Sequence, residues 1–204
     1  MDMKNINLFL CIFVLMGCTK EDLFPSTSLE GGTWITGCSY SGTSSIYGIN
    51  TARFAGGSFY QSATAYGAGC TSGIAKMEIT GTYSIGSKLA TSGSVELDLK
   101  VATLTLTPLN STLVSNYNNL TYCGYSDWAI GVAKDVAGRT CDGSTQAAVG
   151  EMIYDIYNIN QYSIPEFNIV QGNLSFGYNH SSHDGKTPAK RPEATNGNFS
   201  YSRN

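Results

Sequence analysis

Charge is scarce in this sequence. Lysine, arginine, aspartate and glutamate make up 13% of the 204 residues, about half of their share in an average soluble protein. The formal net charge is −3, so the chain lacks the basic footprint of a nucleic-acid-binding protein. The apolar run at residues 8–16 is too short for a membrane-spanning helix, which needs about 20 residues, and no other stretch is apolar enough.

Groups that carry chemistry are also few. The only histidines are His180 and His183, which lie in a Gly- and Ser-rich loop next to Asp184. A His-x-x-His pair with an aspartate can hold a metal ion, but no helix fixes its geometry here. The sequence has no nucleophile elbow, no phosphate-binding loop and no dinucleotide fingerprint. We therefore expect no metal, no cofactor and no catalysis; the alternative is a hydrolase that uses His180 or His183.

The N-terminus has the layout of a secretory signal, with Lys4 ahead of the apolar run and polar residues after Cys18. Leu15-Met16-Gly17-Cys18 resembles the bacterial lipobox: an aliphatic residue, a variable one, a small one and a cysteine. The resemblance implies that the chain is cut before Cys18 and that this cysteine carries acyl chains such as palmitate. The alternative is an ordinary signal peptide with a chance cysteine.

From this resemblance we expect a signal peptide at residues 1–17, a lipid-anchored tether at residues 18–30 and a single β domain at residues 31–204. The expected location is the bacterial cell envelope, with the membrane as partner through the anchor. Thr19 is not the aspartate that tends to retain such proteins at the inner membrane, which favours the outer membrane.

Four cysteines remain for the folded domain: Cys38, Cys70, Cys123 and Cys141. An even number in an exported chain indicates two disulfides. Three pairings are possible, and we favour the two local ones, Cys38–Cys70 and Cys123–Cys141. A zinc site competes, but no two of these cysteines stand two to four residues apart.

Glycine, tyrosine, serine and threonine are abundant, which favours β-structure with many turns. Alternating segments predict strands at residues 34–38, 45–54, 58–66, 76–85, 95–107, 128–136, 152–159, 167–170, 174–178 and 198–203. Gln171-Gly172-Asn173 is expected to form the turn of the hairpin between two of them. One short helix is expected at residues 111–120, capped by Ser111.

The strand at residues 95–107 is the most informative. Apolar residues occupy its odd positions as far as Val101, and then its even positions at Leu104 and Leu106. A shift of one residue turns every later side chain to the other face of the sheet. A β-bulge near Ala102 would restore the pattern and bend the strand. Long, bent strands with one polar face suit a closed antiparallel sheet.

Gly32-Thr33-Trp34 opens the first strand, and Arg203 stands at the end of the last. This is similar to the lipocalin pattern, in which a Gly-x-Trp at the start of the barrel is covered by an arginine from near its end. The resemblance implies an up-and-down barrel of about eight to ten strands, closed by Gly32, Trp34 and Arg203, with a small apolar ligand in its mouth. The alternative fold is a β-sandwich.

These features predict a membrane-anchored, non-catalytic lipoprotein that binds a small apolar ligand. The alternative is a structural or cell-surface interaction lipoprotein without a ligand cavity. Sequence does not indicate which residues would bind the ligand, because the tyrosines could either pack between strands or line a mouth.

Overall fold

The structure is a computed structural model that describes residues 28–40, 46–164, 169–197 and 199–203. The expected signal peptide and the lipidation site Cys18 lie outside the described residues. Among the described residues, no helix has the length and apolarity needed to cross a membrane. The strands are β1 (Thr33–Thr36), β2 (Ser39–Tyr40), β3 (Tyr47–Ala55), β4 (Ser58–Tyr66), β5 (Gly73–Lys88), β6 (Val95–Pro108), β7 (Lys134–Asp135), β8 (Thr140–Cys141), β9 (Ser144–Thr145), β10 (Met152–Ile164), β11 (Ile169–Phe176) and β12 (Tyr201–Arg203). The helices are α2 (Ser111–Asn119) and the 3-10 turns η3 (Ala68–Cys70), η4 (Tyr122–Gly124) and η6 (Pro188–Lys190).

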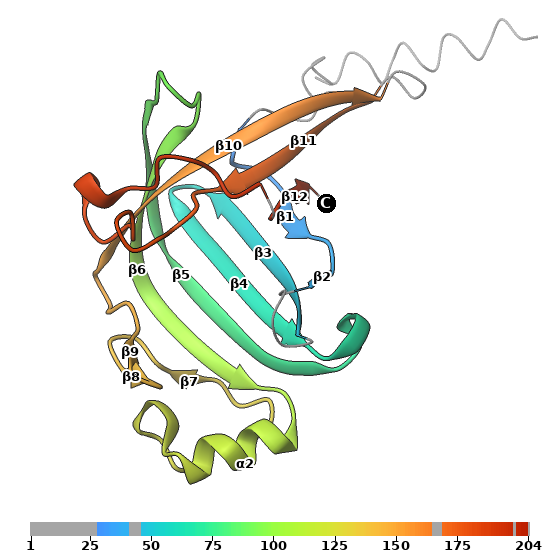
Figure 1. Ribbon diagram of the computed structural model, residues 1–204, viewed down its shortest axis with the longest axis vertical. Coiled ribbons are helices and arrows are strands. Elements are labelled where there is room, and N and C mark those ends of the chain that lie inside the picture. Colours follow the sequence, from blue (N-terminus) through green and yellow to red (C-terminus); the bar gives the residue numbers. More distant parts are fainter. Residues whose placement is uncertain (1–27, 41–45, 165–168, 198, 204) are drawn as a thin grey trace, which may run out of the picture.

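Eight strands form a closed antiparallel barrel (Figure 1). In chain order they are β1, β3, β4, β5, β6, β10, β11 and β12, and each pairs with the next. The ring closes because β1 pairs with both β12 and β3. β2 adds to the edge of β3, and β7 pairs with the second half of β6 where β10 has ended. The predicted up-and-down barrel is confirmed, and the sandwich alternative is wrong.

The bend in β6 comes from the bulge that the sequence predicts. Thr80 pairs with Thr103 and Gly81 with Val101, so Ala102 is the extra residue. The apolar side chains on both sides of the bulge are buried, from Leu97 to Leu106. Gly81 is required opposite the bulge, because a Cβ atom there would lie 1.9 Å from the carbonyl oxygen of Lys100.

The chain between β6 and β10 folds over the inner face of the sheet at its lower end in Figure 1. Trp128, Val136, Cys123 and Cys141 pack there against Leu104 and Leu106, which point into the barrel. Both predicted disulfides are present, Cys38–Cys70 and Cys123–Cys141. The second one ties η4 to β8 and so holds this covering segment together.

Three local expectations are wrong. Residues 128–136 do not form one strand, and only Lys134–Asp135 is a strand. The backbone N–H and C=O of Trp128 are hydrogen-bonded to the side-chain amide of Asn118, so they do not pair with a neighbouring strand. The helix cap is Asn110, whose side chain accepts a hydrogen bond from the backbone of Leu113, and not Ser111.

The third concerns Gly172, which lies inside β11 and not in a turn. β11 pairs with β10 without interruption, so these two strands are the hairpin. A Cβ atom at Gly172 would lie 3.2 Å from Ile159 and 3.8 Å from the indole of Trp34. A side chain there would crowd Ile159 of β10, whereas the indole lies at ordinary contact distance. The packed structure also includes Leu29, which is buried beside Trp34 and stands two residues before the expected start of the domain.

Candidate functional site

One end of the barrel is closed by Trp34. Its side chain is only 1% exposed, and its indole nitrogen donates to the carbonyl oxygen of Leu29 at 2.9 Å. The guanidinium of Arg203 lies 4.6 Å from the indole centroid, within the range of a cation–π contact. Arg203 also donates to the carbonyl oxygens of Ser28 (2.6 Å) and Glu30 (2.8 Å).

Gly32 lies beneath this arginine, since a Cβ atom there would come within 3.3 Å of its Cγ and Cδ. Trp34 and Arg203 are direct partners in the register of β1 and β12, so their side chains lie on the same, inner face of the barrel. The structure therefore brings the three predicted closure residues into one contact.

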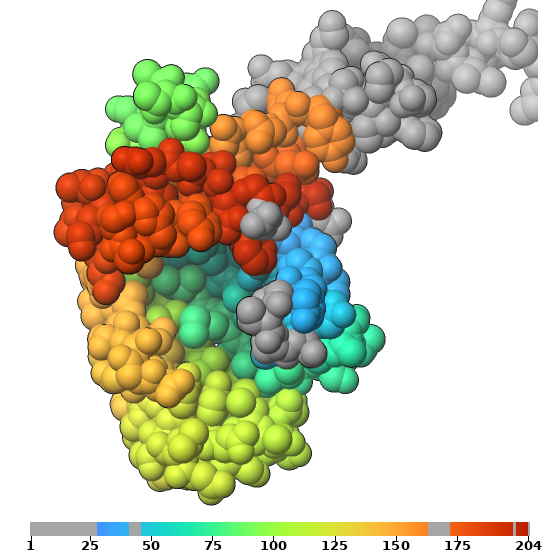
Figure 2. Space-filling view, viewed as in Figure 1, coloured from blue at the N-terminus to red at the C-terminus, as the bar shows by residue number. Residues whose placement is uncertain are grey.

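The interior becomes more open away from Trp34. Along the inner face of β4, Phe59 is buried, Gln61 is half-buried and Ala63 is exposed. Along β3, Ala52 is buried and Asn50 is half-buried. Figure 2 shows the corresponding hollow, between the C-terminal segment above it and α2 below it, with β4 and β5 at its floor. The barrel is thus packed around Trp34 and again where the segment between β6 and β10 covers Leu104 and Leu106, and the hollow lies between these two clusters.

A pocket of about 200 Å³ lies on this inner face. It is lined by Asn50, Phe176, Gly177, Asn196, Phe199 and Tyr201. Phe176 and Tyr201 meet edge to face, with ring centroids 5.3 Å apart. Phe199 is 38% exposed at the rim. We call this pocket the barrel mouth.

The polar groups near the barrel mouth have shifted pKa values. Burial raises the pKa of Tyr201 to about 12, and the negative charge of Asp155 adds to that shift. Burial also raises the pKa of Asp155 to about 6, although its carboxylate accepts from the backbone of Ile156 and Gly177. The mouth therefore presents neutral aromatic surface with one weakly acidic carboxyl nearby.

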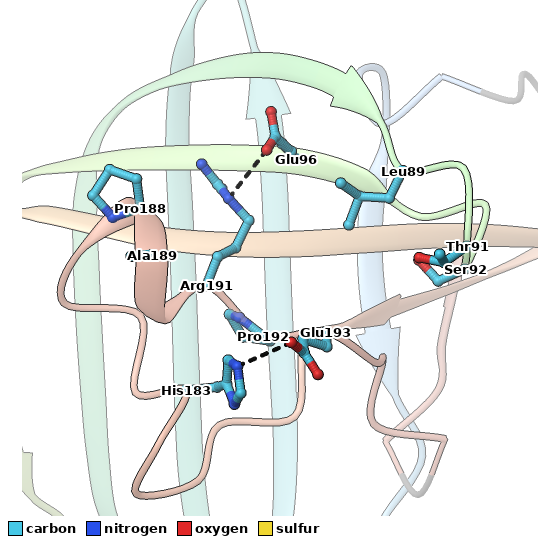
Figure 3. Close-up of a pocket in the computed structure, with 10 residues that line it drawn as sticks. All are labelled: Leu89, Thr91, Ser92, Glu96, His183, Pro188, Ala189, Arg191, Pro192 and Glu193. Carbon is cyan, nitrogen blue, oxygen red and sulfur yellow. Dashed lines mark ion pairs between the residues drawn. The ribbon is translucent and has the colours of Figure 1, made fainter.

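A second, larger groove of about 650 Å³ lies between the β5–β6 hairpin and the C-terminal segment (Figure 3). Arg191 joins the two walls. It pairs with Glu96 at 3.5 Å and with Asp98 at 2.6 Å, and it donates to the carbonyl oxygens of Asp155 (2.6 Å) and Leu97 (3.3 Å). These interactions engage several of the guanidinium nitrogens of Arg191 with groups of β6 and β10. The arginine therefore holds the C-terminal segment against the barrel.

The two histidines meet at the rim of this groove. The side chain of Ser182 lies 2.9 Å from Nδ1 of His180 and 3.1 Å from Nδ1 of His183. The Nε2 atom of His183 lies 3.2 Å from a carboxylate oxygen of Glu193. Ser182, His183 and Glu193 thus place a hydroxyl, an imidazole and a carboxylate in the order found in the catalytic triad of serine hydrolases. However, Ser182 is exposed in a turn, contacts both rings and is not among the residues that line the groove.

The described part of the chain contains no group of three or more His, Cys, Asp or Glu side chains placed to share a metal ion. The four described cysteines are taken up by the two disulfides. None of the residues that line the barrel mouth was predicted from sequence to bind a ligand. Phe199 and Tyr201 alternate with serines in the sequence, but only the register of β12 reveals that Tyr201 points inward.

No protein-family model matches this chain, and a search of curated proteins gives no match either.

Proposed function

We propose that this chain is a non-catalytic bacterial lipoprotein, anchored to the outer membrane through Cys18, that binds a small apolar or aromatic ligand in the barrel mouth. The anchor is supported by the lipobox resemblance at residues 15–18. Two disulfides favour an oxidising compartment, as expected for an exported protein.

The observation that carries the binding proposal is the aromatic pocket just below the packed end of the barrel. Binding pockets are concave and mostly apolar, with a few polar groups that orient the ligand. Phe176, Phe199 and Tyr201 supply the apolar walls. The side-chain amide of Asn50 supplies a polar group, and among the described residues no hydrogen bond occupies it.

The size of the pocket limits the ligand. Pockets for drug-sized molecules have about 300–1,000 Å³, whereas the barrel mouth has about 200 Å³. A single aromatic ring or a short acyl chain fits this space, and a sterol does not. A longer ligand would place one end in the mouth and the rest along the open inner face of β4.

A thermal-shift screen tests the proposal, with indole, p-cresol, octanoate and cholesterol as probes. A ligand of the folded state raises its stability by about 2.7 kcal/mol at one hundred times its dissociation constant. For a chain of this length that corresponds to about 5–10 °C. We expect a shift with a one-ring probe or octanoate and none with cholesterol.

Phe199→Ala should remove most of that shift with little change in the unliganded melting temperature, because Phe199 is an exposed rim residue. Tyr178→Ala is the matched control, since Tyr178 is an exposed aromatic of the same segment outside the pocket. Binding that is unchanged in Phe199→Ala, or absent from the unmodified protein with every probe, would refute the proposal.

The anchor is tested separately. Cys18→Ser removes the thiol that accepts the acyl chains, so labelling of cells with a fatty-acid analogue should be lost. Undiminished labelling of the serine variant would contradict it.

One observation favours a structural or cell-surface interaction role as a second candidate. Leu120, Ile130, Val132 and Val149 are each at least half exposed, and all belong to the segment between β6 and β10. Exposed apolar side chains mark a site of protein interaction where they form a contiguous patch, and four in one segment make it the candidate surface for such a patch. If no probe binds, cross-linking in cells with a photoreactive residue at Ile130 would identify a partner of this segment.

A further inference from the structure

His180 and His183 are held in a fixed relation by the backbone. The amide of His180 donates to the carbonyl oxygen of His183 at 3.2 Å, and the amide of His183 donates back at 2.9 Å. The two residues thus form an isolated antiparallel bridge around a two-residue turn. Side chains of directly opposed residues lie on the same side of such a pair, so both imidazoles project together.

One nitrogen atom of each ring faces the other ring. Nε2 of His180 lies 3.2 Å from Nδ1 of His183, and the ring centroids are 4.9 Å apart. Zinc–nitrogen bonds of 2.0–2.1 Å in tetrahedral geometry place two ligand nitrogens about 3.3 Å apart. The observed spacing therefore matches two ligands of one ion.

The neighbouring groups favour a free electron pair on both nitrogens. Glu193 lies 3.2 Å from Nε2 of His183, and its carboxylate favours a proton on that atom, which leaves a lone pair on Nδ1. Ser182 can accept from Nδ1 of His180 at 2.9 Å, which leaves a lone pair on Nε2. The same hydroxyl lies 3.1 Å from Nδ1 of His183, and an ion at that nitrogen would replace this contact. A carboxylate that accepts from the second ring nitrogen, as Glu193 does here, is a usual outer contact of a metal-binding histidine. Figure 3 shows the His183–Glu193 pair at the edge of the groove.

We propose that Nε2 of His180 and Nδ1 of His183 bind a divalent ion of the zinc type, with Glu193 as the positioning residue for His183. Imidazole nitrogen suits zinc and copper. The remaining coordination positions belong to solvent, which leaves the ion exchangeable and open to an anionic ligand in the groove. This site is independent of the barrel mouth.

Titration calorimetry with Zn²⁺ on the protein purified without a histidine tag tests the site. We expect binding of one ion. His180→Asn and His183→Asn should each weaken it at least tenfold, and Glu193→Gln should weaken it about tenfold because it removes the negative charge of the outer partner. Asp184→Asn is the matched control, since Asp184 lies in the same loop but pairs with Lys190. Its affinity should be unchanged.

Imidazole nitrogen NMR of the unmodified protein gives a second readout that needs no variant. On addition of Zn²⁺, the signals of Nε2 of His180 and Nδ1 of His183 should shift together, while Nε2 of His183 keeps its proton. Failure of Zn²⁺ to bind, equal affinity in both histidine variants, or a shift confined to one ring would overturn the proposal. In those cases the two nitrogens share an ordinary hydrogen bond.

Discussion

Replacement of Arg203 by alanine removes the side chain that covers the closed end of the barrel. The guanidinium lies 4.6 Å from the centroid of the Trp34 ring and donates to two carbonyl oxygens, those of Ser28 and Glu30. These contacts join β12, the last strand of the barrel, to β1 and to the residues before it. We therefore expect the loss to weaken the closure of the whole barrel and not only its C-terminus.

The magnitude can be worked from these contacts. A cation–π contact that is partly shielded from water contributes about 1–2 kcal/mol. Two hydrogen bonds from a charged donor would add about 1.5–3 kcal/mol each if buried, but Ser28 and Glu30 are exposed, so water replaces much of that gain. The Nε atom of Arg203 is buried without a hydrogen-bond partner, which offsets part of the sum. The net expectation for Arg203→Ala is about 2–3 kcal/mol of unfolding free energy.

Urea denaturation with tryptophan fluorescence measures this change, and Trp34 reports on the site itself. Arg203→Lys should recover less than half of the loss, because an ammonium cannot both stack on the indole and reach two carbonyl groups. Arg53→Ala is the matched control: within the described residues this exposed arginine of β3 bonds only to the side chain of Thr33, and its loss should cost less than about 1 kcal/mol. Equal losses in Arg203→Ala and Arg53→Ala would refute the closing role of Arg203.

Three further changes have expected outcomes. Trp34→Ala should cost about 3–5 kcal/mol in the same urea assay, as for other buried large-to-small changes. Gly81→Ala should cost at least about 3 kcal/mol and reduce the yield of folded protein, because its Cβ atom would lie 1.9 Å from the carbonyl oxygen of Lys100. Asp155 has its pKa raised to about 6 in the folded protein, so its contribution to stability is fully present below the unfolded pKa of about 4 and is lost as pH rises through about 6. The unmodified protein should therefore lose up to about 3 kcal/mol between pH 4 and pH 7 relative to Asp155→Asn, measured by melting at each pH.

The strand pattern, the bulge and the disulfides could be predicted from sequence because each depends on local spacing. The change of phase at Val101 and Leu104 requires one extra residue whichever strand lies next to it. Likewise, Cys123 and Cys141 are close along the chain, and the local pairing was the simplest of three. The closure contact depended on the lipocalin resemblance, which supplied the pairing of residues at opposite ends of the domain.

Other features could not be predicted because they depend on distant partners. Gly172 has the local signature of a turn, yet it lies in β11 because that strand pairs with β10 without interruption, and only this pairing shows that a side chain there would crowd Ile159. Trp128 lies in an apolar stretch, yet the amide of Asn118 satisfies its backbone in place of a neighbouring strand. For His183, the sequence predicts the pair with His180 but not the contact with Glu193, which stands later in the C-terminal segment.

The hollow of the barrel follows from side-chain size once the register is known. From the closed end outward, the inner face of β4 carries Phe59, Gln61, Ala63 and Ala65, so the volume projecting into the barrel falls along the strand. Small side chains leave unfilled space at the open end of the barrel. At the closed end, large side chains fill the corresponding space. Since Ala63 is exposed on this inner face, a larger apolar side chain there would meet water and not packed atoms. Larger side chains at these inward positions would add packing contacts, so it is the small residues of β4 that keep this space open.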